Sequence, residues 1–277
     1  MTTGIHSNNN SNNNFKLLKT GIEIAGWNII TQNKPILRST EKDEWEESLK
    51  LNSLPEMIYG NNFIRLSNQK ISMIFNAHDA LKLCPKESDE SIKVSYAKKW
   101  QEINKSTFEG TDNNEPKKKY DWTYSTTYKG TIIYNDQTIL NETPIELIEA
   151  TEEQINIEKL KRPVPILFYD DILLYEDELA DNGTSILSVK IRVMNDSFFL
   201  LLRYYLRVDD VIVRAYDTRI YHEFDKSYLL REFSVKETNF DTIKHLFEKD
   251  PSLLTNSDFI VTKLPTVSTK IDKILIK

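Results

Sequence analysis

Residues 186–216, ILSVKIRVMNDSFFLLLRYYLRVDDVIVRAY, contain three runs of alternating side chains separated by short polar segments. Successive side chains of a β-strand point to opposite faces of a sheet, so each run can bury one face and present the other. Asn195–Ser197 and Asp209–Asp210 are typical of turns, because their side chains can bond their own backbone. The segment therefore predicts an antiparallel meander that buries Leu200 and Leu202 and carries Lys190 and Arg192 on its other face.

The rest of the chain adds short strands and short helices to this meander. We expect strands within residues 21–38, 63–66, 71–75 and 120–134, the last because it is rich in aromatic and β-branched side chains. Helical spacing is expected over residues 41–51, 76–83, 93–101 and 152–161. These elements predict an α+β fold of mostly antiparallel β-sheet, sandwich-like, with flanking short helices.

Composition divides the chain into one domain and two tails. Residues 1–14 are rich in Asn and Ser, offer nothing to bury, and are expected to be disordered. A single domain is expected over residues 15–265, with a mobile polar loop at about 103–119. Residues 266–277 are expected to form a C-terminal tail.

Charge and cysteine usage restrict the class of protein. The chain of 277 residues has 42 acidic and 36 basic residues, a net charge of −6, which argues against nucleic acid as a partner. The single cysteine, Cys84, excludes an intrachain disulfide and a thiolate metal cluster. The longest apolar run, Phe198–Leu202, falls far short of the roughly 20 residues that span a bilayer. We expect no membrane partner and no secretory signal, and we predict a cytoplasmic protein with access to the nucleus.

The sequence offers little for a catalytic centre. It lacks GxSxG, GxGxxG and P-loop patterns, so we expect no catalytic residue and no cofactor. The alternative hypothesis is a metal-dependent hydrolase using His78, Asp79, Asp217 and His222, whose side chains are suitable ligands for Zn or Fe. Their spacing matches no metal motif, and a helix-capping Asp79 with a partly buried His222 explains the same residues.

Aromatic and basic side chains suggest a binding surface. Tyr120, Trp122 and Tyr124 share one face if they lie on a strand, and such a ladder suits either a core or a groove. Seven cations fall on adjoining strands: Lys190, Arg192, Arg203, Arg207, Arg214, Arg219 and Arg231. They either pair with nearby Asp and Glu or recognise the carboxylate of a partner, since guanidinium groups bind carboxylates bidentately.

Several motifs together resemble the TIPRL (TIP-forty-one-like) family, regulators of the TOR signalling pathway. The similarity covers about Trp27 to Glu237. It is carried by SLPEM (53–57), FNA (75–77), DAL (79–81), YDWTY (120–124), YKGT (128–131), EDEL (176–179), LSVKIRVM (187–194), FFLLLR (198–203), DTR (217–219), YHE (221–223) and LRE (230–232).

The resemblance implies a non-enzymatic protein that binds the catalytic subunits of type 2A-family serine/threonine phosphatases and accepts their C-terminal tail in a cleft. It leaves phosphatase adaptor proteins open as further partners. The family's phosphatase-contact positions correspond to Asp79, Ile155 and Asp217. A family methionine two residues before the last of these is replaced here by Ala215.

We therefore hypothesise a β face bearing Trp122, Tyr124, Lys190 and Arg192 that holds an extended peptide, with Arg219 contributing to recognition of its terminal carboxylate. A third interpretation, an RNA-binding β module, predicts strongly salt-sensitive RNA affinity and is the weakest, given the net charge of −6.

Overall fold

The computed structural model describes residues 14–51, 53–84, 123–134, 147–149, 153–179 and 181–276. The predicted tail up to residue 13, the helix at 93–101, the loop at 103–119 and Trp122 lie outside the described residues.

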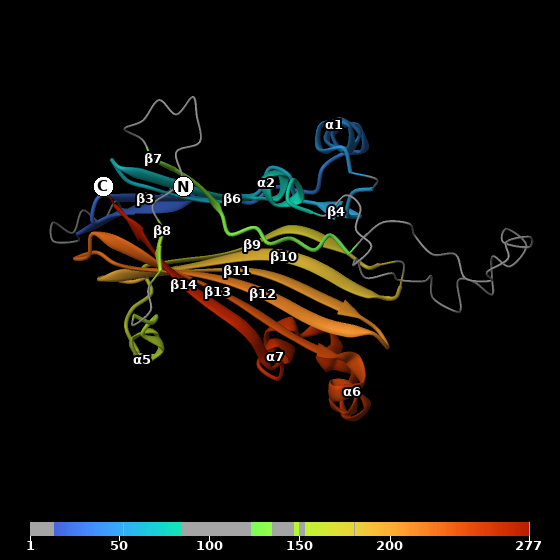
Figure 1. The fold of residues 1–277 in the computed structure, drawn as a ribbon. Helices are drawn as coiled ribbons and strands as arrows, with labels where there is room; N and C mark the ends of the chain where they lie inside the picture. The colour runs from blue at the N-terminus through green and yellow to red at the C-terminus, as the bar shows by residue number, and fades with distance from the viewer. Residues whose placement is uncertain are drawn as a thin grey trace, which may run out of the picture.

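Two antiparallel sheets are stacked as two layers (Figure 1). The smaller sheet has the order β1 (Phe15–Leu18), β2 (Gly21–Ile24), β3 (Trp27–Gln32), β5 (Phe63–Ser67), β6 (Ile71–Asn76) and β7 (Thr131–Tyr134). The larger sheet has the order β4 (Met57–Ile58), β9 (Phe168–Asp177), β10 (Gly183–Val193), β11 (Ser197–Val208), β12 (Ile212–Glu223), β13 (Tyr228–Asn239), β14 (Thr266–Leu275) and β8 (Leu147–Glu149). The predicted α+β, sandwich-like fold class is confirmed.

The meander at the centre of the larger sheet has the predicted faces. Leu202 on β11 lies between Val189 on β10 and Thr218 on β12, and all three are buried. They face the smaller sheet, and Val189 and Leu202 join one hydrophobic cluster with its side chains, including Ile29 and Phe75. We call this side the inner face of the larger sheet and the opposite side, which carries Lys190 and Arg192, the outer face.

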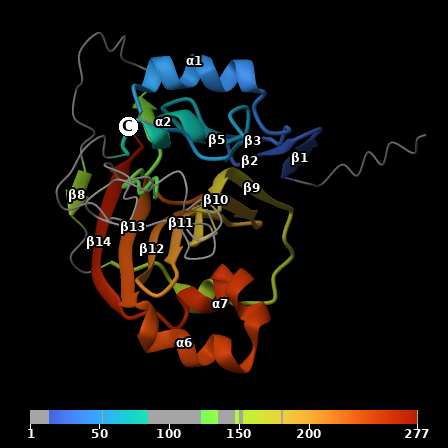
Figure 2. The same cartoon turned by 90° about the vertical axis from the view of Figure 1, so that its right-hand side faces the viewer.

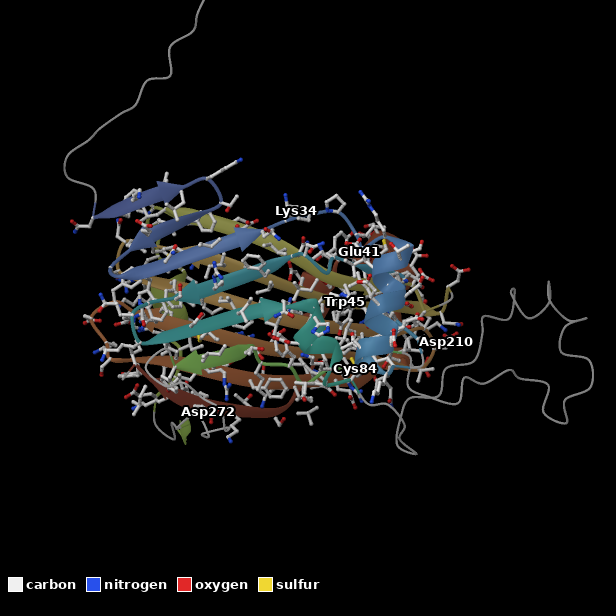
Figure 3. All side chains as sticks on the ribbon, turned by 90° about the horizontal axis from the view of Figure 1, so that it is seen from above. Lys34, Glu41, Trp45, Cys84, Asp210 and Asp272 are labelled. Carbon is white, nitrogen blue, oxygen red and sulfur yellow. The ribbon has the colours of Figure 1, made fainter. Side chains whose placement is uncertain are left out.

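Helices flank both layers (Figure 2). On the side of the smaller sheet lie α1 (Ser39–Leu49) and α2 (Ala77–Leu81), and on the outer face of the larger sheet lie α5 (Ile157–Leu160), α6 (Phe240–Lys249), the 3₁₀ helix η1 (Pro251–Thr255) and α7 (Ser257–Val261). Viewed from above, α1 with Glu41 and Trp45 crosses one end of the strands, and Asp210 in the β11–β12 turn lies at that same end (Figure 3). No helix in the described ranges is both long and apolar enough to cross a membrane.

The outer face is covered more than the alternation of the strands suggests. Tyr205 and Ala215 project from it and are 1% and 0% exposed, because they pack against Phe240 and Ile260 of α6 and α7. At the other end of the face, Ile155, next to α5, packs against Tyr221 and Leu230. The part of the outer face that remains accessible is therefore confined between these two helical covers.

Two predictions about individual segments are wrong. Of the described residues in the predicted strand 120–134, only Thr131–Tyr134 are β, and Tyr124 has a positive φ of 56°. Buried hydrogen bonds of the preceding segment, such as Tyr124 Oη to the carbonyl oxygen of Leu54 at 3.0 Å, replace strand pairing there. Residues 266–277 are not a free tail, because Thr266–Leu275 form β14, which pairs with β13 and β8.

Candidate functional site

Ion pairs organise the charges of the larger sheet. Of the seven cations singled out from the sequence, six pair with carboxylates: Lys190, Arg203, Arg207, Arg214, Arg219 and Arg231. Lys190 lies 3.2 Å from Asp171 and 3.0 Å from Asp258, and Arg219 bonds Glu232 on the next strand. For these six side chains the structure favours pairing within the protein over a free site for a partner's carboxylate.

The strongest of these pairs joins Arg203 of β11 to Asp217 of β12. The two residues are register partners, and the guanidinium donates from Nε and Nη2 to both carboxylate oxygens at 2.7 and 2.8 Å. Asp217 is 1% exposed. The third donor, Nη1, bonds Asp258 of α7 at 2.6 Å, so this pair also anchors α7 to the sheet.

The surrounding charges shift the pKa values of this network. Burial alone would lower the pKa of Arg203, but its hydrogen bonds and charge interaction with Asp217 outweigh burial and raise it. Burial would likewise raise the pKa of Asp258, yet Lys190 and Arg203 lower it. Both shifts favour the charged forms of Arg203 and Asp258, as expected for groups that pair with opposite charges.

Arg192 is the exception among the seven cations. It has no carboxylate partner in the described part of the chain. Its Nη2 donates to the carbonyl oxygen of Leu160 at 2.6 Å, and its Nε is buried with no acceptor among the described residues. A buried N–H that lacks an acceptor carries a desolvation cost of about 1–3 kcal/mol. An acceptor supplied by a ligand would remove that cost.

Beside Arg192 lies a hollow of about 280 Å³ between α5 and the outer face. Its walls include Ile157 and Leu160 of α5, Tyr169 of β9 and Phe199 of β11. Ile157 and Tyr169 are 43% and 55% exposed, so the hollow is open to a partner from outside. The hollow can hold an apolar side chain, and the Arg192 guanidinium beside it can bind a carboxylate. A peptide C-terminus with an apolar last residue supplies both groups. We call it the Arg192 groove.

Asp79 lies elsewhere, on the side of the smaller sheet. Its carboxylate accepts from Thr131 Oγ1 of β7 at 2.7 Å and from Asn76 Nδ2 at 3.0 Å, while Asn76 Oδ1 caps α2 through the Asp79 N–H at 2.8 Å. Burial acts to raise the pKa of Asp79, but these hydrogen bonds and the charge of Lys82 outweigh it and lower the pKa. The predicted capping role of Asp79 is wrong, because Asn76 is the N-cap and Asp79 is a residue of the first helical turn that accepts a hydrogen bond from it.

The residues predicted to bind a partner do not form one surface. Lys190, Arg192, Asp217 and Arg219 project from the outer face, and Ile155 covers part of it but is 4% exposed. Tyr124 is 4% exposed and belongs to the core between the sheets, so it does not share a face with Lys190 and Arg192. Ala215, at the position of the family methionine, is buried beneath α6 and α7.

The alternative metal site is contradicted by geometry. Asp217 and His222 lie five positions apart on β12 and therefore point to opposite faces, Asp217 outward and His222 into the core against Trp27 and Phe198. His78 and Asp79 belong to α2, on the smaller sheet. Within the described residues no three His, Cys, Asp or Glu side chains converge as metal ligands.

Two components of the outer face had escaped the sequence analysis. The carbonyl group of Leu160 holds Arg192, and Asp258 joins Lys190 to Arg203. A backbone carbonyl gives no sequence signal. Asp258 had a faint one, because Asn256 two residues earlier is a helix cap whose side chain accepts from the Phe259 N–H at 2.9 Å.

Comparison with known proteins identifies the family. Residues 57–244 match the model of the TIP41-like family. The chain is 60% identical to "TIP41-like protein" of Dictyostelium discoideum, over 96% of both chains. It is 40% identical to "TIP41-like protein" of Homo sapiens (90% of this chain, 87% of the relative) and 42% identical to "Type 2A phosphatase activator TIP41" of Saccharomyces cerevisiae (89% and 72%). The resemblance seen in the sequence is thus confirmed, and the chain belongs to the TIP41-like family.

Proposed function

We propose that this protein is a non-enzymatic regulator of type 2A-family serine/threonine phosphatases in TOR signalling, acting in the cytoplasm. It binds the phosphatase catalytic subunit and holds the C-terminal tail of that subunit in the Arg192 groove. The names of two relatives support the phosphatase as the target: the Saccharomyces cerevisiae and Schizosaccharomyces pombe proteins are both called type 2A phosphatase activators.

The observation that carries the tail-binding proposal is the state of Arg192. Lys190 and Arg219, which we had also expected to recognise a carboxylate, are already neutralised by Asp171, Asp258 and Glu232. Arg192 keeps an unpaired Nε beside an apolar hollow. A chain terminus brings a carboxylate for the guanidinium and an apolar last side chain for the hollow, so it satisfies both features together.

Binding of the purified full-length protein to a type 2A catalytic subunit tests this proposal. We expect Arg192→Gln to weaken binding by about tenfold, since a charge-assisted bidentate contact is lost. Deleting the last residues of the phosphatase should weaken binding of the wild type but add little to the effect of Arg192→Gln. Arg192→Lys should restore only part of the affinity, because an ammonium group lacks the planar fork.

Arg65→Gln is the matched control. Arg65 is an exposed cation on β5 of the smaller sheet, so its substitution changes the net charge equally on the other layer of the molecule. Equal affinity of Arg192→Gln and Arg65→Gln, with both proteins folded, would remove the groove from the tail-binding site. Failure of the wild type to bind any type 2A catalytic subunit would remove the proposed function itself.

A further inference from the structure

A second hollow lies on the outer face, at the end of β10 opposite Arg192. It has a volume of about 340 Å³ and is lined by Glu176 of β9, Glu178, Asp181, Ile186 of β10 and Tyr205 of β11. Glu176, Ile186 and Tyr205 are successive register partners across the three strands, so they form one row of the outer face. We call this hollow the acidic pocket.

The three carboxylates of the acidic pocket contrast with the rest of the outer face. Asp171, Asp217, Glu232 and Asp258 are all paired with cations. Glu176, Glu178 and Asp181 form no ion pair with any described residue. The single cation of the lining, Arg207, is engaged by Asp209 at 2.8 Å and by the carbonyl oxygen of Leu254 at 2.6 Å. The pocket therefore keeps an uncompensated negative charge.

Crowding makes this charge unfavourable in the unliganded protein. Burial, and then the neighbouring Glu178, raise the pKa of Glu176 above its usual value. Two carboxylates that oppose each other's ionisation are stabilised when a cation enters between them. A metal ion is not the expected cation, because no three acidic side chains of the described chain converge as ligands.

A buried hydroxyl group gives an independent indication of a ligand. Tyr205 is 1% exposed, and its Oη makes no hydrogen bond to any residue in the described part of the chain. Buried tyrosine hydroxyl groups usually find a partner, and an unpaired one carries a desolvation cost. Tyr205 and Glu176 line the same hollow, and the charged neighbours of the Tyr205 hydroxyl group are Arg207 and Asp209. A side chain with several N–H donors can therefore meet a carboxylate on one side of the pocket and the hydroxyl oxygen on the Arg207 side. Side chains that combine several N–H donors with positive charge are arginine and lysine.

We propose that the acidic pocket binds an arginine or lysine side chain of the same partner segment whose terminal carboxylate lies at Arg192, an inference that rests on the proposed function. Ile186 and Arg192 both project from the outer face and lie six positions apart on β10. Six residues of a strand span roughly 20 Å at about 3.3 Å per residue. An extended segment with a basic residue about six positions before its C-terminus therefore reaches both sites, with opposite charge at each.

Peptide binding to the full-length protein tests this inference. The probe is a ten-residue peptide with a free C-terminus and one arginine six positions before its last residue. The comparison peptide has the same sequence with neutral citrulline in place of that arginine. We expect the arginine peptide to bind about tenfold more tightly, as for a charge-assisted hydrogen-bonded contact. The preference should fall to about one in the double variant Glu176→Gln, Glu178→Gln, and Tyr205→Phe should reduce it while leaving the protein folded.

Glu46→Gln with Glu47→Gln is the control, because these exposed residues of α1 change the net charge equally on the opposite side of the molecule. It should keep the full preference for arginine. If wild type binds both peptides equally, yet binds them more tightly than their C-terminally amidated forms, the acidic pocket is refuted and the Arg192 groove stands. If the wild type prefers neither arginine over citrulline nor a free over an amidated C-terminus, both the acidic pocket and the Arg192 groove are refuted. If the Glu176→Gln, Glu178→Gln variant keeps the full preference for arginine, the arginine does not bind in this pocket.

Discussion

Asp79 and Asp217 are implied by family resemblance as equivalent contacts of a phosphatase, yet they occupy very different regions. Asp79 sits at the start of α2 on the smaller sheet, partly exposed, and its partners are neutral side chains and one exposed lysine. Asp217 lies on the outer face of the larger sheet, 1% exposed, in a bidentate pair with Arg203. The carboxylate of Asp79 is exposed enough to contact a partner directly. The carboxylate of Asp217 is buried and paired, so it can affect a partner only by stabilising the folded larger sheet.

The largest effect that can test this difference is the loss of Asp217. We expect Asp217→Ala to lower the free energy of unfolding by about 3–5 kcal/mol, because it leaves the Arg203 guanidinium buried with only Asp258 as a partner. Urea unfolding followed by circular dichroism measures this. The double variant Arg203→Met, Asp217→Leu should regain most of the loss. A change below about 1 kcal/mol for Asp217→Ala would place Asp217 with Asp79 as a surface residue.

Asp79→Ala should have a smaller effect on stability. It removes the acceptor for Thr131 and Asn76 and so loosens α2 from β7, at a cost of about 1–2 kcal/mol. The effect on phosphatase affinity should exceed what this destabilisation explains, if Asp79 contacts the partner. Thr131→Val is the matched control, since it removes the same hydrogen bond and keeps the carboxylate. Equal affinity of both variants would make Asp79 structural as well.

His222 on the inner face makes the folded larger sheet sensitive to acid. Burial lowers its pKa below 6.5, so the folded state holds the imidazole neutral where the unfolded chain binds a proton. The neutral imidazole contributes fully to the free energy of unfolding at a pH above the pKa that His222 has in the unfolded chain. This contribution is lost as the pH falls, and the loss is on the order of 1 kcal/mol between pH 7 and pH 5. Chemical denaturation across this range should show a shallower slope for His222→Phe. His78→Gln on the smaller sheet, where burial also lowers the pKa, measures the contribution of the other region.

The smallest effect is expected for Asp258, the second carboxylate on Arg203. Its side chain is 58% exposed, so Asp258→Asn should change the free energy of unfolding by less than about 1 kcal/mol. Comparison with Asp217→Asn then isolates burial as the variable, because the two carboxylates share one guanidinium. If Asp258→Asn and Asp217→Asn lower the free energy of unfolding by similar amounts, the attachment of α7, and not burial of the carboxylate, decides how much each ion pair stabilises the fold.

The sequence was sufficient for the elements whose two faces differ in polarity. β10 was predicted with the correct faces because Val189 and Ile191 alternate with Lys190 and Arg192. β11 was predicted correctly because its cations, Arg203 and Arg207, both fall on the face opposite Leu200 and Leu202. β14 was missed because its first five residues are exposed and carry no apolar alternation. The aromatic segment around Tyr124 was wrongly predicted as a strand. Strand propensity depends on neighbouring residues, whereas the hydrogen bonds of Tyr124 reach Ser53 and Leu54, which are distant in the sequence.

The candidate site was only partly predictable for a similar reason. The alternation identified Lys190, Arg192 and Arg203 as outward-facing cations, but it could not tell which of them acquire a carboxylate from another element. That outcome depends on α7, which follows β13 and folds back over the outer face (Figure 2). Only the three-dimensional arrangement separates Arg192, which has no carboxylate partner among the described residues, from its neutralised neighbours.

Gly183, at the start of β10, restricts how this protein can be redesigned. Its φ is 152°, and a Cβ there would lie 1.9 Å from the carbonyl oxygen of Arg207, which is backbone and cannot rotate away. Every other amino acid at position 183 should therefore separate β10 from β11 at the rim of the acidic pocket. A saturation-mutagenesis library should therefore show that position 183 accepts glycine alone, whereas the neighbouring Thr184, a half-buried residue of the same rim, should accept several side chains.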